Sequence, residues 1–354
     1  MSWECKPEQQ YDPRMRVLAW PARANRDLNP YNSLLYGALE QIGVRVLEWA
    51  GNLVDLEQVD VLHLHWPESP LNLPDPSGIN LVLEAVRLAR AQNVRVVWTA
   101  HNLQAHAGIH AKLEHEFWDK FCASLDGVIA LSNHSRAALL EKHSSLEHVA
   151  ITVIPHGHYR SAYPNAISRD QARASLNLPL EVPVLAFVGQ VRAYKGIPEL
   201  LSAFGKLEGD ARLLITGKPV PPEDAPHLET LAARDARVHL VFGFVPDDRF
   251  QLFLNAADLI VLPYRQILNS GSALLALSFD RPVLAPAIGS LPELAQKMGG
   301  DWLQLFNGDL EASDLRNALA VSRTVRDQVA PLEDFYWDQI AVKTKRFYLE
   351  LTSR

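Results

Sequence analysis

Val59-Asp-Val-Leu-His-Leu-His-Trp66 is a short apolar run of the kind that forms a buried β-strand. A helical pattern follows near Ile79 to Gln92, and Val94-Arg-Val-Val-Trp-Thr-Ala100 is a second strand-like run. A strand, a helix and another strand in this order make a βαβ unit, whose two strands are parallel. The stretch therefore predicts a parallel sheet with helices on both faces.

The same alternation continues through the first half of the chain. Helical patterns lie at Pro30 to Gln41 and His110 to Ser124. Four further runs have the character of strands: 16–20, 44–49, 127–131 and 151–154. Six strands with helical crossovers predict one doubly wound α/β domain.

A segment with several prolines, Tyr159 to Pro183, interrupts this rhythm, and a second βα series follows it. The strand-like runs of the second series are 184–188, 212–216, 238–242, 259–262 and 282–285. We therefore predict two Rossmann-like domains, residues 1–163 and 164–330, that face each other across a cleft. Residues 331–354 contain a final helical pattern, which either ends the second domain or crosses back to the first.

The composition is that of an ordinary globular protein, and it excludes several function classes. A formal net charge of -7 on 354 residues gives no global attraction to nucleic acid. Cys5 and Cys122 are too far apart in sequence to indicate a disulfide framework or a metal-binding pair. The N-terminus lacks the apolar core of a signal peptide, and no apolar run has the length of a membrane span. These features favour a cytoplasmic protein.

Ligands of doubly wound sheets bind outside the carboxyl ends of the strands, so the residues after each strand are candidate site residues. In the first half, Glu68 follows one strand, His101 follows the next and His156 follows a third. His63 and His65 lie on a strand and suit either a functional or a buried structural role. Glu68 likewise suits either catalysis or the capping of its turn.

In the second half, Gly189-Gln-Val-Arg-Ala-Tyr-Lys-Gly196 follows a strand and opens a helix. The guanidinium of Arg192 can bond two phosphate oxygens, Lys195 adds a positive charge, and the helix start offers free N–H groups. The segment, Gly189 included, predicts a diphosphate site. The alternative is an isolated Arg-x-x-Lys pair on a solvated surface.

A second polar loop, Leu262 to Ser272, also joins a strand to the start of a helix. It has residue types that let a backbone approach an anion: Asn269, Ser270, Gly271 and Ser272, with Tyr264 in the same loop. Glu293 stands just inside a later helix, where its carboxylate can accept from sugar or ribose hydroxyls or cap the helix. The sequence has no Gly-x-x-x-x-Gly-Lys-Ser/Thr loop and no Asp-x-Asp pair, so we expect chemistry without a metal or a cofactor.

Together these motifs resemble those of the GT-B nucleotide-sugar glycosyltransferases over nearly the whole chain. The resemblance lies in Asn29-Pro-Tyr31, Val61-Leu-His-Leu-His-Trp-Pro-Glu68, His101-Asn-Leu103, His156-Gly-His-Tyr-Arg160, Arg192-Ala-Tyr-Lys-Gly196, Leu262-Pro-Tyr-Arg-Gln266 and Asn269-Ser-Gly271. Within this fold they look like the GDP-mannose-dependent glycolipid 4-β-mannosyltransferases of xanthan-type exopolysaccharide assembly, in glycosyltransferase family 94 and, more distantly, family 4.

The resemblance implies a nucleotide-sugar donor, GDP-mannose, and a lipid-diphosphate-linked oligosaccharide acceptor on the first domain. It implies that Arg192 and Lys195 hold the diphosphate and that Glu293 binds a sugar or ribose hydroxyl. The remaining donor contacts are expected from Gly189, Tyr264, Asn269, Ser270, Gly271, Ser272 and His156. A lipid-linked acceptor implies peripheral attachment at the inner face of the membrane. The apolar side chains considered for it, which are equally compatible with a core, are Tyr31, Leu34, Leu35, Phe117 and Trp118.

The larger, retaining group of this fold carries two glutamates separated by seven residues, and Leu268 and Ala276 stand at the corresponding places here. We therefore expect inversion, a direct displacement that needs a general base and stabilisation of the departing diphosphate. The candidates for the base are Glu68, His101 and Asp27. In related enzymes the His at the position of His101 tends to contact the donor sugar, which favours Glu68.

Three other functions stay open at this stage. One is a retaining family 4 transferase with another nucleotide-sugar, and another is a GT-B nucleotide-sugar 2-epimerase, which needs no acceptor. The third is a non-catalytic two-lobed sugar-binding module, which the pairing of Arg192 with Lys195 disfavours.

Overall fold

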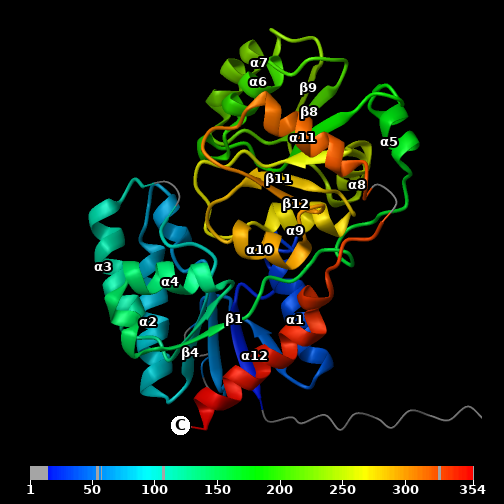
Figure 1. Ribbon diagram of the computed structural model, residues 1–354. Helices are drawn as coiled ribbons and strands as arrows, with labels where there is room; N and C mark the ends of the chain where they lie inside the picture. Colours follow the sequence, from blue (N-terminus) through cyan, green and yellow to red (C-terminus); the bar gives the residue numbers. More distant parts are fainter. Residues whose placement is uncertain (1–14, 53–55, 57, 106–107, 326–327, 354) are drawn as a thin grey trace, which may run out of the picture. The chain divides into compact units, whose positions relative to one another are not determined.

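The computed structural model describes residues 15–52, 56, 58–105, 108–325 and 328–353, which form two compact units (Figure 1). Unit 1 takes the chain up to Gly157 together with the segment from Phe335 onward. Unit 2 takes His158–Asp334. The boundary thus lies just ahead of the segment 159–183, and the last helix belongs to unit 1.

Unit 1 contains a six-stranded sheet in which every neighbouring pair of strands is parallel. Its strands are β1 (Arg16–Trp20), β2 (Arg45–Glu48), β3 (Val61–His65), β4 (Arg95–Ala100), β5 (Gly127–Ala130) and β6 (Ala150–Val153). Their order is β2-β1-β3-β4-β5-β6, which confirms the predicted doubly wound sheet. The order reverses between β1 and β3, and ligands of such sheets bind outside the carboxyl ends of the strands at that point.

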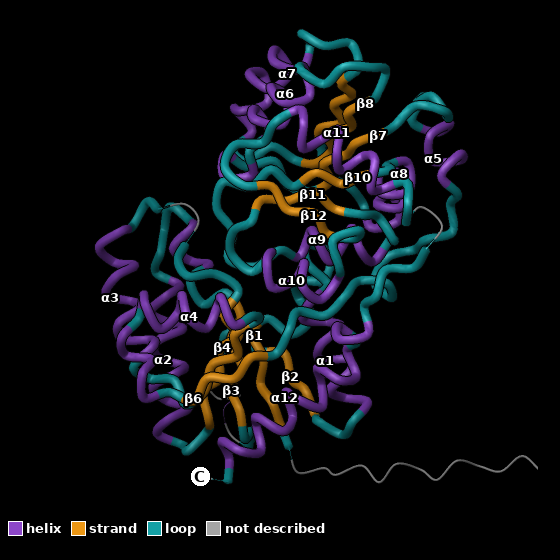
Figure 2. The backbone as a smooth tube through the Cα atoms, in the orientation of Figure 1, coloured by secondary structure: helices purple, strands orange, loops and turns teal. Residues whose placement is uncertain are grey.

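Among its described residues, unit 1 contains five α-helices, which are drawn in purple in Figure 2. They are α1 (Tyr31–Gln41), α2 (Gly78–Ala91), α3 (Ala111–Cys122), α4 (Asn133–Lys142) and α12 (Trp337–Thr352). Helix α12 packs along α1, although some three hundred residues separate the two helices in the sequence. The contact of Lys345 Nζ with Ile42 O, at 2.8 Å, fixes this pairing at one end.

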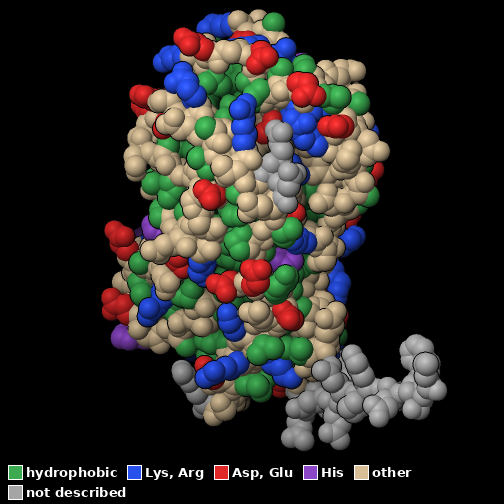
Figure 3. Space-filling model, turned by 45° about the vertical axis from the view of Figure 1, so that its right-hand side comes forward, with side chains coloured by type: hydrophobic (Ala, Val, Ile, Leu, Met, Phe, Trp, Pro, Cys, Tyr) green, Lys and Arg blue, Asp and Glu red, His purple; other side chains and the backbone are tan. Residues whose placement is uncertain are grey.

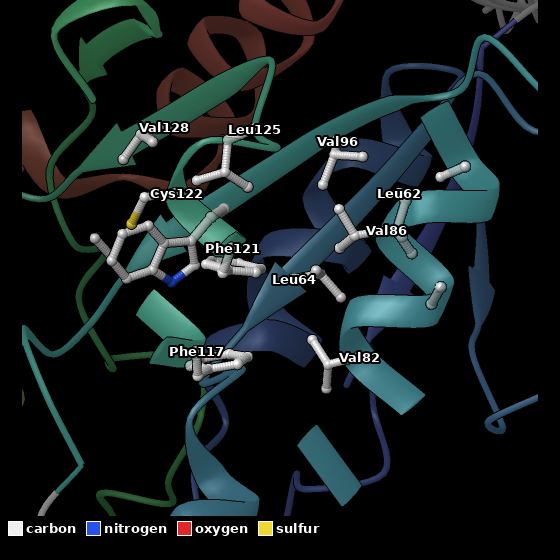
Figure 4. Close-up of a cluster of buried hydrophobic side chains, with 14 of the residues drawn as sticks. Leu62, Leu64, Val82, Val86, Val96, Phe117, Phe121, Cys122, Leu125 and Val128 are labelled. Atoms are coloured by element: carbon white, nitrogen blue, oxygen red, sulfur yellow. The ribbon is translucent and has the colours of Figure 1, made fainter. Parts of the chain in front are cut away.

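Successive side chains of β3 point to opposite faces of the sheet, as a strand requires. Leu62 and Leu64 pack against α2 and α3 in a large apolar cluster. Figure 4 shows part of this cluster: Val82, Val86, Phe117, Phe121 and Cys122. His63 and His65 point to the other face, where α1 and α12 pack. The polar residues of β3 therefore lie under two helices.

The side chains considered as membrane contacts belong mainly to the core. Tyr31 and Leu35 are buried against α12, and Phe117 and Trp118 are buried in the α2–α3 cluster. Leu34 is partly buried and packs against the same core as Leu35. Helical spacing turns these residues toward the sheet, so they are structural. None of the helices built from described residues has both the length and the apolar character needed to cross a bilayer.

Unit 2 contains a second parallel sheet, with strand order β12-β11-β10-β7-β8-β9. Its strands are β7 (Val184–Val188), β8 (Arg212–Gly217), β9 (Val238–Phe242), β10 (Leu259–Val261), β11 (Val283–Pro286) and β12 (Leu303–Phe306). The order reverses between β7 and β10. Strand β12 was not predicted; it is a four-residue strand at the sheet edge, and its middle residues are only partly buried. A run this short carries too few apolar positions to stand out.

The helices of unit 2 are α5 (Arg169–Ser175), α6 (Ile197–Gly205), α7 (Ala225–Ala232), α8 (Phe250–Ala256), α9 (Gly271–Ser278), α10 (Leu291–Met298) and α11 (Ala312–Ser322). Helices α6, α9 and α10 begin in the loops that follow β7, β10 and β11, so their N-termini lie at the carboxyl edge of the sheet. On the face that Figure 3 shows, acidic and basic side chains are interspersed with neutral ones.

Arg173 of α5 is fully buried and ties that helix to the sheet. Its guanidinium donates to Asp258 Oδ2 at 2.7 Å and to the carbonyls of Leu180, Val182 and Ala256. Asp258 also accepts from Arg169 at 3.3 Å. Burial acts to raise the pKa of Asp258, but the guanidinium of Arg173, together with a backbone hydrogen bond and the guanidinium of Arg169, holds it below its usual value.

We expect Arg173→Ala to lower the free energy of unfolding by about 2–3 kcal/mol, because it leaves a buried carboxylate and three carbonyls with fewer partners. The loss is limited because Arg169 still donates a hydrogen bond to Asp258. Arg346→Ala is the control, since its ion pair with Glu350 is exposed and contributes less than about 1 kcal/mol. Urea unfolding measures both. Equal effects of the two substitutions would contradict the claim that the buried Arg173 stabilises unit 2.

Candidate active site

The loops at the carboxyl edge of the unit 1 sheet bring several predicted residues together. Glu68 follows β3, and His101 and Asn102 follow β4, its neighbour in the sheet. Asn102 Nδ2 donates to Glu68 Oε1 at 2.8 Å, which joins the two loops. The two strand ends therefore form one polar cluster beside the point where the strand order reverses.

Glu68 is a buried carboxyl group at the start of a 3₁₀ turn, Ser69–Asn72. Its side chain is only 2% exposed. Burial raises the pKa of Glu68 to about 7, and the hydrogen bond from Asn102 opposes that rise in part. A carboxylate with a pKa near neutrality can take up a proton at physiological pH, which is what a general base requires.

Trp66 orients His101. The two rings are stacked, with centroids 4.1 Å apart and planes 17° from parallel. The backbone of Trp66 is left-handed, with a φ of 48°, a conformation that is rare for a bulky residue and often marks a functional site. His101 is half-buried, and the edge of the Tyr31 ring packs against it at 4.8 Å.

Behind His101 lies a buried chain of hydrogen bonds. His101 Nε2 bonds His65 Nδ1 at 3.0 Å, and His65 Nε2 bonds the hydroxyl of Tyr36 at 2.7 Å. His63 Nδ1 bonds the hydroxyls of Tyr36, at 3.0 Å, and Tyr348, at 2.6 Å. Burial lowers the pKa of His63 to about 3 and those of His65 and His101 well below the usual value, so all three imidazoles are neutral.

Two further residues predicted for the site are placed differently. Asp27 is exposed in the loop after β1, and no hydrogen bond or ion pair between described residues joins it to Glu68 or His101. His156, expected among the donor contacts, belongs to unit 1, where its ring lies 4.6 Å from that of Tyr31. Burial lowers the pKa of His156 to about 4, against a hydrogen bond with the carbonyl of Gly157.

In unit 2, the loops after β7 and β10 converge at the reversal of the strand order. A side-chain carbon placed on Gly189 would lie 3.7 Å from both Lys195 Nζ and Ser272 Oγ. Gly189 has a φ of 140°, which only glycine adopts readily, and it leaves an open approach to these two groups. The Lys195 ammonium and the Ser272 hydroxyl therefore both lie beside the backbone of Gly189, where no side chain covers them.

Lys195 is a buried cation, with 9% of its surface exposed. Its ammonium lies 5.3 Å from the centre of the Tyr264 ring and 5.7 Å from that of Phe187. Burial lowers the pKa of Lys195. Among described residues no carboxylate forms an ion pair with it. A buried charge of this kind is costly unless an ion of opposite sign binds to it.

Tyr264 lies beside the Lys195 ammonium. Burial raises the pKa of Tyr264, and hydrogen bonds with Ser272 and Ser270 oppose the rise. Ser270 also caps α9, since its Oγ accepts from Ala273 N at 3.1 Å. The first residue of α9 is Gly271. The predicted residues Tyr264, Ser270, Gly271 and Ser272 thus lie together beside Lys195.

The start of α6 comes very close to the end of β10. Gly196 has a φ of 69°, and a side-chain carbon there would collide with the carbonyl oxygen of Pro263. Only glycine fits this approach. Arg192 precedes it, is half-buried, and donates from Nε to Gln190 Oε1 at 3.2 Å. Arg192 thus lies in the same β7 loop as Lys195.

The loop after β11 lies against the loop after β10. Ser290 N donates to Leu268 O at 3.1 Å, and Gly289 packs on the carbonyl of Ile267. Glu293 is half-buried in the first turn of α10, and Asn269 is half-buried in the adjoining loop. The loops after three neighbouring strands, β7, β10 and β11, therefore contribute all the predicted donor-binding residues except His156, which belongs to unit 1. No group of three metal-ligating side chains is found in the described parts of either unit.

Tyr36 and Tyr348 were not predicted as site residues, and the roles of His63 and His65 were left open between functional and structural. Both tyrosines lie on helices, away from the strand ends that were searched. Tyr348 follows His63 by 285 positions in the chain. The spacing of His63 and His65 on one strand face was the one signal available for this network.

Two family models match the chain, one in each unit. Residues 22–158 match the model described as Glycosyltransferase Family 4, and residues 182–320 match Glycosyl transferases group 1. Among solved structures, sucrose-phosphate synthase from Thermosynechococcus elongatus covers 96% of this chain and all of its own, with a TM-score of 0.70 and 18% identity. Anabaena HepE in complex with UDP-glucose gives a TM-score of 0.66 at 16% identity, covering 96% and 97% of the two chains. These likenesses confirm the GT-B fold.

Curated relatives give a closer match. The GDP-mannose:glycolipid 4-beta-D-mannosyltransferase of Xanthomonas campestris pv. campestris is 33% identical over 96% of this chain and 93% of its own. The D-inositol 3-phosphate glycosyltransferase of Corynebacterium efficiens is 24% identical over 97% and 82%. The chain is therefore a glycosyltransferase and belongs to the family that includes the Xanthomonas GDP-mannose:glycolipid 4-beta-D-mannosyltransferase.

Proposed function

We propose that this protein transfers mannose from GDP-mannose to a lipid-diphosphate-linked oligosaccharide, with inversion, in exopolysaccharide biosynthesis. The observation that carries the proposal is the 33% identity, over 96% of the chain, to the Xanthomonas glycolipid mannosyltransferase. The two polar clusters support it. One contains Glu68, a carboxyl group with a pKa of about 7, and the other contains Lys195, a buried cation suited to binding a phosphate.

In the proposed reaction, Glu68 removes the proton of the acceptor hydroxyl as its oxygen attacks the anomeric carbon of mannose. The bond from that carbon to the diphosphate oxygen breaks, and GDP departs with the electron pair. Lys195 and Arg192 stabilise the charge that develops on the diphosphate, together with the N-termini of α6 and α9. Because these cations meet the charge, we propose that no metal ion is needed.

Other residues are proposed to bind the donor. His101 contacts the mannosyl group, and Glu293 accepts from a hydroxyl of the sugar or ribose. Inversion is favoured because Leu268 and Ala276 occupy the places where the retaining enzymes carry glutamates. Ala276 is fully buried on α9, so no carboxylate stands there.

A lipid-linked acceptor places the protein, in this proposal, at the inner face of the membrane. Two exposed apolar side chains of unit 1, Leu73 and Ile109, support peripheral contact. Their loops are joined, because His110 Nε2 bonds Leu73 O at 2.9 Å. An exposed apolar pair of this kind can enter the interfacial layer of a bilayer without crossing it.

The donor is tested by thermal stabilisation. We expect GDP-mannose to raise the melting temperature and UDP-glucose at the same concentration to leave it unchanged, since a ligand bound only by the folded protein shifts unfolding. Product analysis by NMR then gives the anomeric configuration of the new bond, which we expect to be β. Stabilisation by UDP-glucose alone would reject GDP-mannose as the donor.

A retaining transfer is the second candidate. It is favoured by the family 4 model over residues 22–158 and by 27% identity, over 64% of both chains, to the Alpha-maltose-1-phosphate synthase of Mycolicibacterium smegmatis. An α-linked product in the same NMR experiment would establish it. Consumption of the nucleotide-sugar with no acceptor present would instead indicate an epimerase.

A further inference from the structure

We infer that the buried chain Tyr36–His65 sets the tautomer of His101, so that this imidazole always presents a donating Nδ1–H to its ligand. Tyr36 and His65 act in this as positioning residues, with Tyr348 and His63 behind them. The inference rests on the proposed function for the identity of the ligand, the mannosyl group of the donor. The tautomer itself follows from the hydrogen bonds alone.

The donor-to-acceptor direction of these hydrogen bonds is fixed at Tyr348, the end of the series farthest from His101. The hydroxyl of Tyr348 is fully buried, and His63 Nδ1, at 2.6 Å, is its hydrogen-bond partner among described residues. A buried O–H without an acceptor is costly, so Tyr348 donates and the lone pair of His63 Nδ1 accepts. Neutral His63 then carries its proton on Nε2, which donates to Thr99 Oγ1 at 2.8 Å.

The next links follow in order. The one lone pair of His63 Nδ1 is taken by Tyr348, so the hydroxyl of Tyr36 donates to its other partner, His65 Nε2, at 2.7 Å. Neutral His65 therefore carries its proton on Nδ1 and donates it to His101 Nε2 at 3.0 Å. With Nε2 accepting, neutral His101 keeps its proton on Nδ1.

This arrangement has a chemical consequence. An imidazole that accepts through Nε2 and is protonated on Nδ1 has no lone pair left for an acceptor hydroxyl, so it does not serve as the base. It can donate one hydrogen bond to a sugar oxygen. Stacking on Trp66 and the edge of Tyr31 hold the ring in this orientation. The series of hydrogen bonds thus gives His101 the role of a donor to the sugar and leaves Glu68 as the base.

The tautomer is tested by NMR of the full-length protein labelled with ¹⁵N-histidine. Long-range ¹H–¹⁵N correlations distinguish Nδ1–H from Nε2–H imidazoles, and loss of one signal set in His101→Gln identifies His101 among the 13 histidines. We expect the Nδ1–H form in the wild type without any ligand. The Nε2–H form, or an imidazolium at neutral pH, would overturn the inference whatever the substrate is.

The role of Tyr36 is tested by Tyr36→Phe. We expect His101 to gain a population of the Nε2–H tautomer and the Kd for GDP-mannose to rise about tenfold, the value of one hydrogen bond, while the Kd for GDP is unchanged. Tyr31→Phe is the control for the tautomer, because among described residues the Tyr31 hydroxyl makes no hydrogen bond with Tyr36, His65 or His101. An unaltered His101 tautomer in Tyr36→Phe would overturn the role of Tyr36, and equal weakening of GDP and GDP-mannose would show a structural effect only.

Discussion

Glu68→Gln is expected to lower kcat for mannosyl transfer about 10³-fold and to leave the Kd for GDP-mannose within about twofold of the wild type. The amide is isosteric with the carboxyl group and can still accept from Asn102 Nδ2, whose bond to Glu68 is 2.8 Å long. It cannot take up a proton from the acceptor. Calorimetry with GDP-mannose and a transfer assay with the lipid-linked oligosaccharide measure the two quantities.

We also expect kcat/KM to depend on pH through the ionisation of Glu68. Because the pKa of Glu68 is about 7, the base is ionised above that pH and protonated below it, so kcat/KM should fall as the pH is lowered through 7. Asn102→Leu removes a hydrogen bond that lowers this pKa, so the acid limb of the profile should move to higher pH.

Glu116→Gln is the matched control, since it makes the same exchange at an exposed position of α3. Retention of full activity by Glu68→Gln would exclude Glu68 as the base. The exposed Asp27, in the loop after β1, would then be the next candidate to test, because the tautomer inferred for His101 leaves that imidazole without a free lone pair.

Much of the fold follows from local patterns in the sequence. The βα alternation identified all the strands of unit 1 and those of unit 2 except β12, because buried parallel strands form short, almost continuous apolar runs. The reversal points, between β1 and β3 and between β7 and β10, depend on which strands pair across the sheet. Periodicity does not encode that choice.

The site was predictable where it depends on strand ends. The sequence predicted that Glu68 and His101 lie together, because residues after neighbouring parallel strands gather at one edge of the sheet, and the same rule placed Lys195 at the edge of the unit 2 sheet. Burial was not predictable, although it gives Glu68 its raised pKa and leaves Lys195 without a carboxylate partner among described residues. The contact of Tyr348 with His63 depends on the return of α12 to unit 1, which the sequence left open.

Lys195→Met is expected to weaken GDP-mannose binding about 10²–10³-fold while slightly stabilising the unliganded protein. Methionine keeps the aliphatic stem of the side chain and its packing near Phe187 and Tyr264, so the substitution leaves no large cavity. It removes the ammonium that we propose binds the diphosphate. GDP should lose affinity by the same factor, because the contact is to the phosphates.

The gain in stability has the same physical cause as the loss of binding. Burial lowers the pKa of Lys195, which means that the folded protein holds its charge at a cost when no anion is bound. Replacing that charge should raise the melting temperature without ligand and abolish most of the shift that GDP-mannose produces. Lys206→Ala, at an exposed position after α6, changes the net charge equally and should alter neither quantity. A destabilised Lys195→Met protein that still binds GDP-mannose tightly would show that Lys195 supports the fold and not the donor.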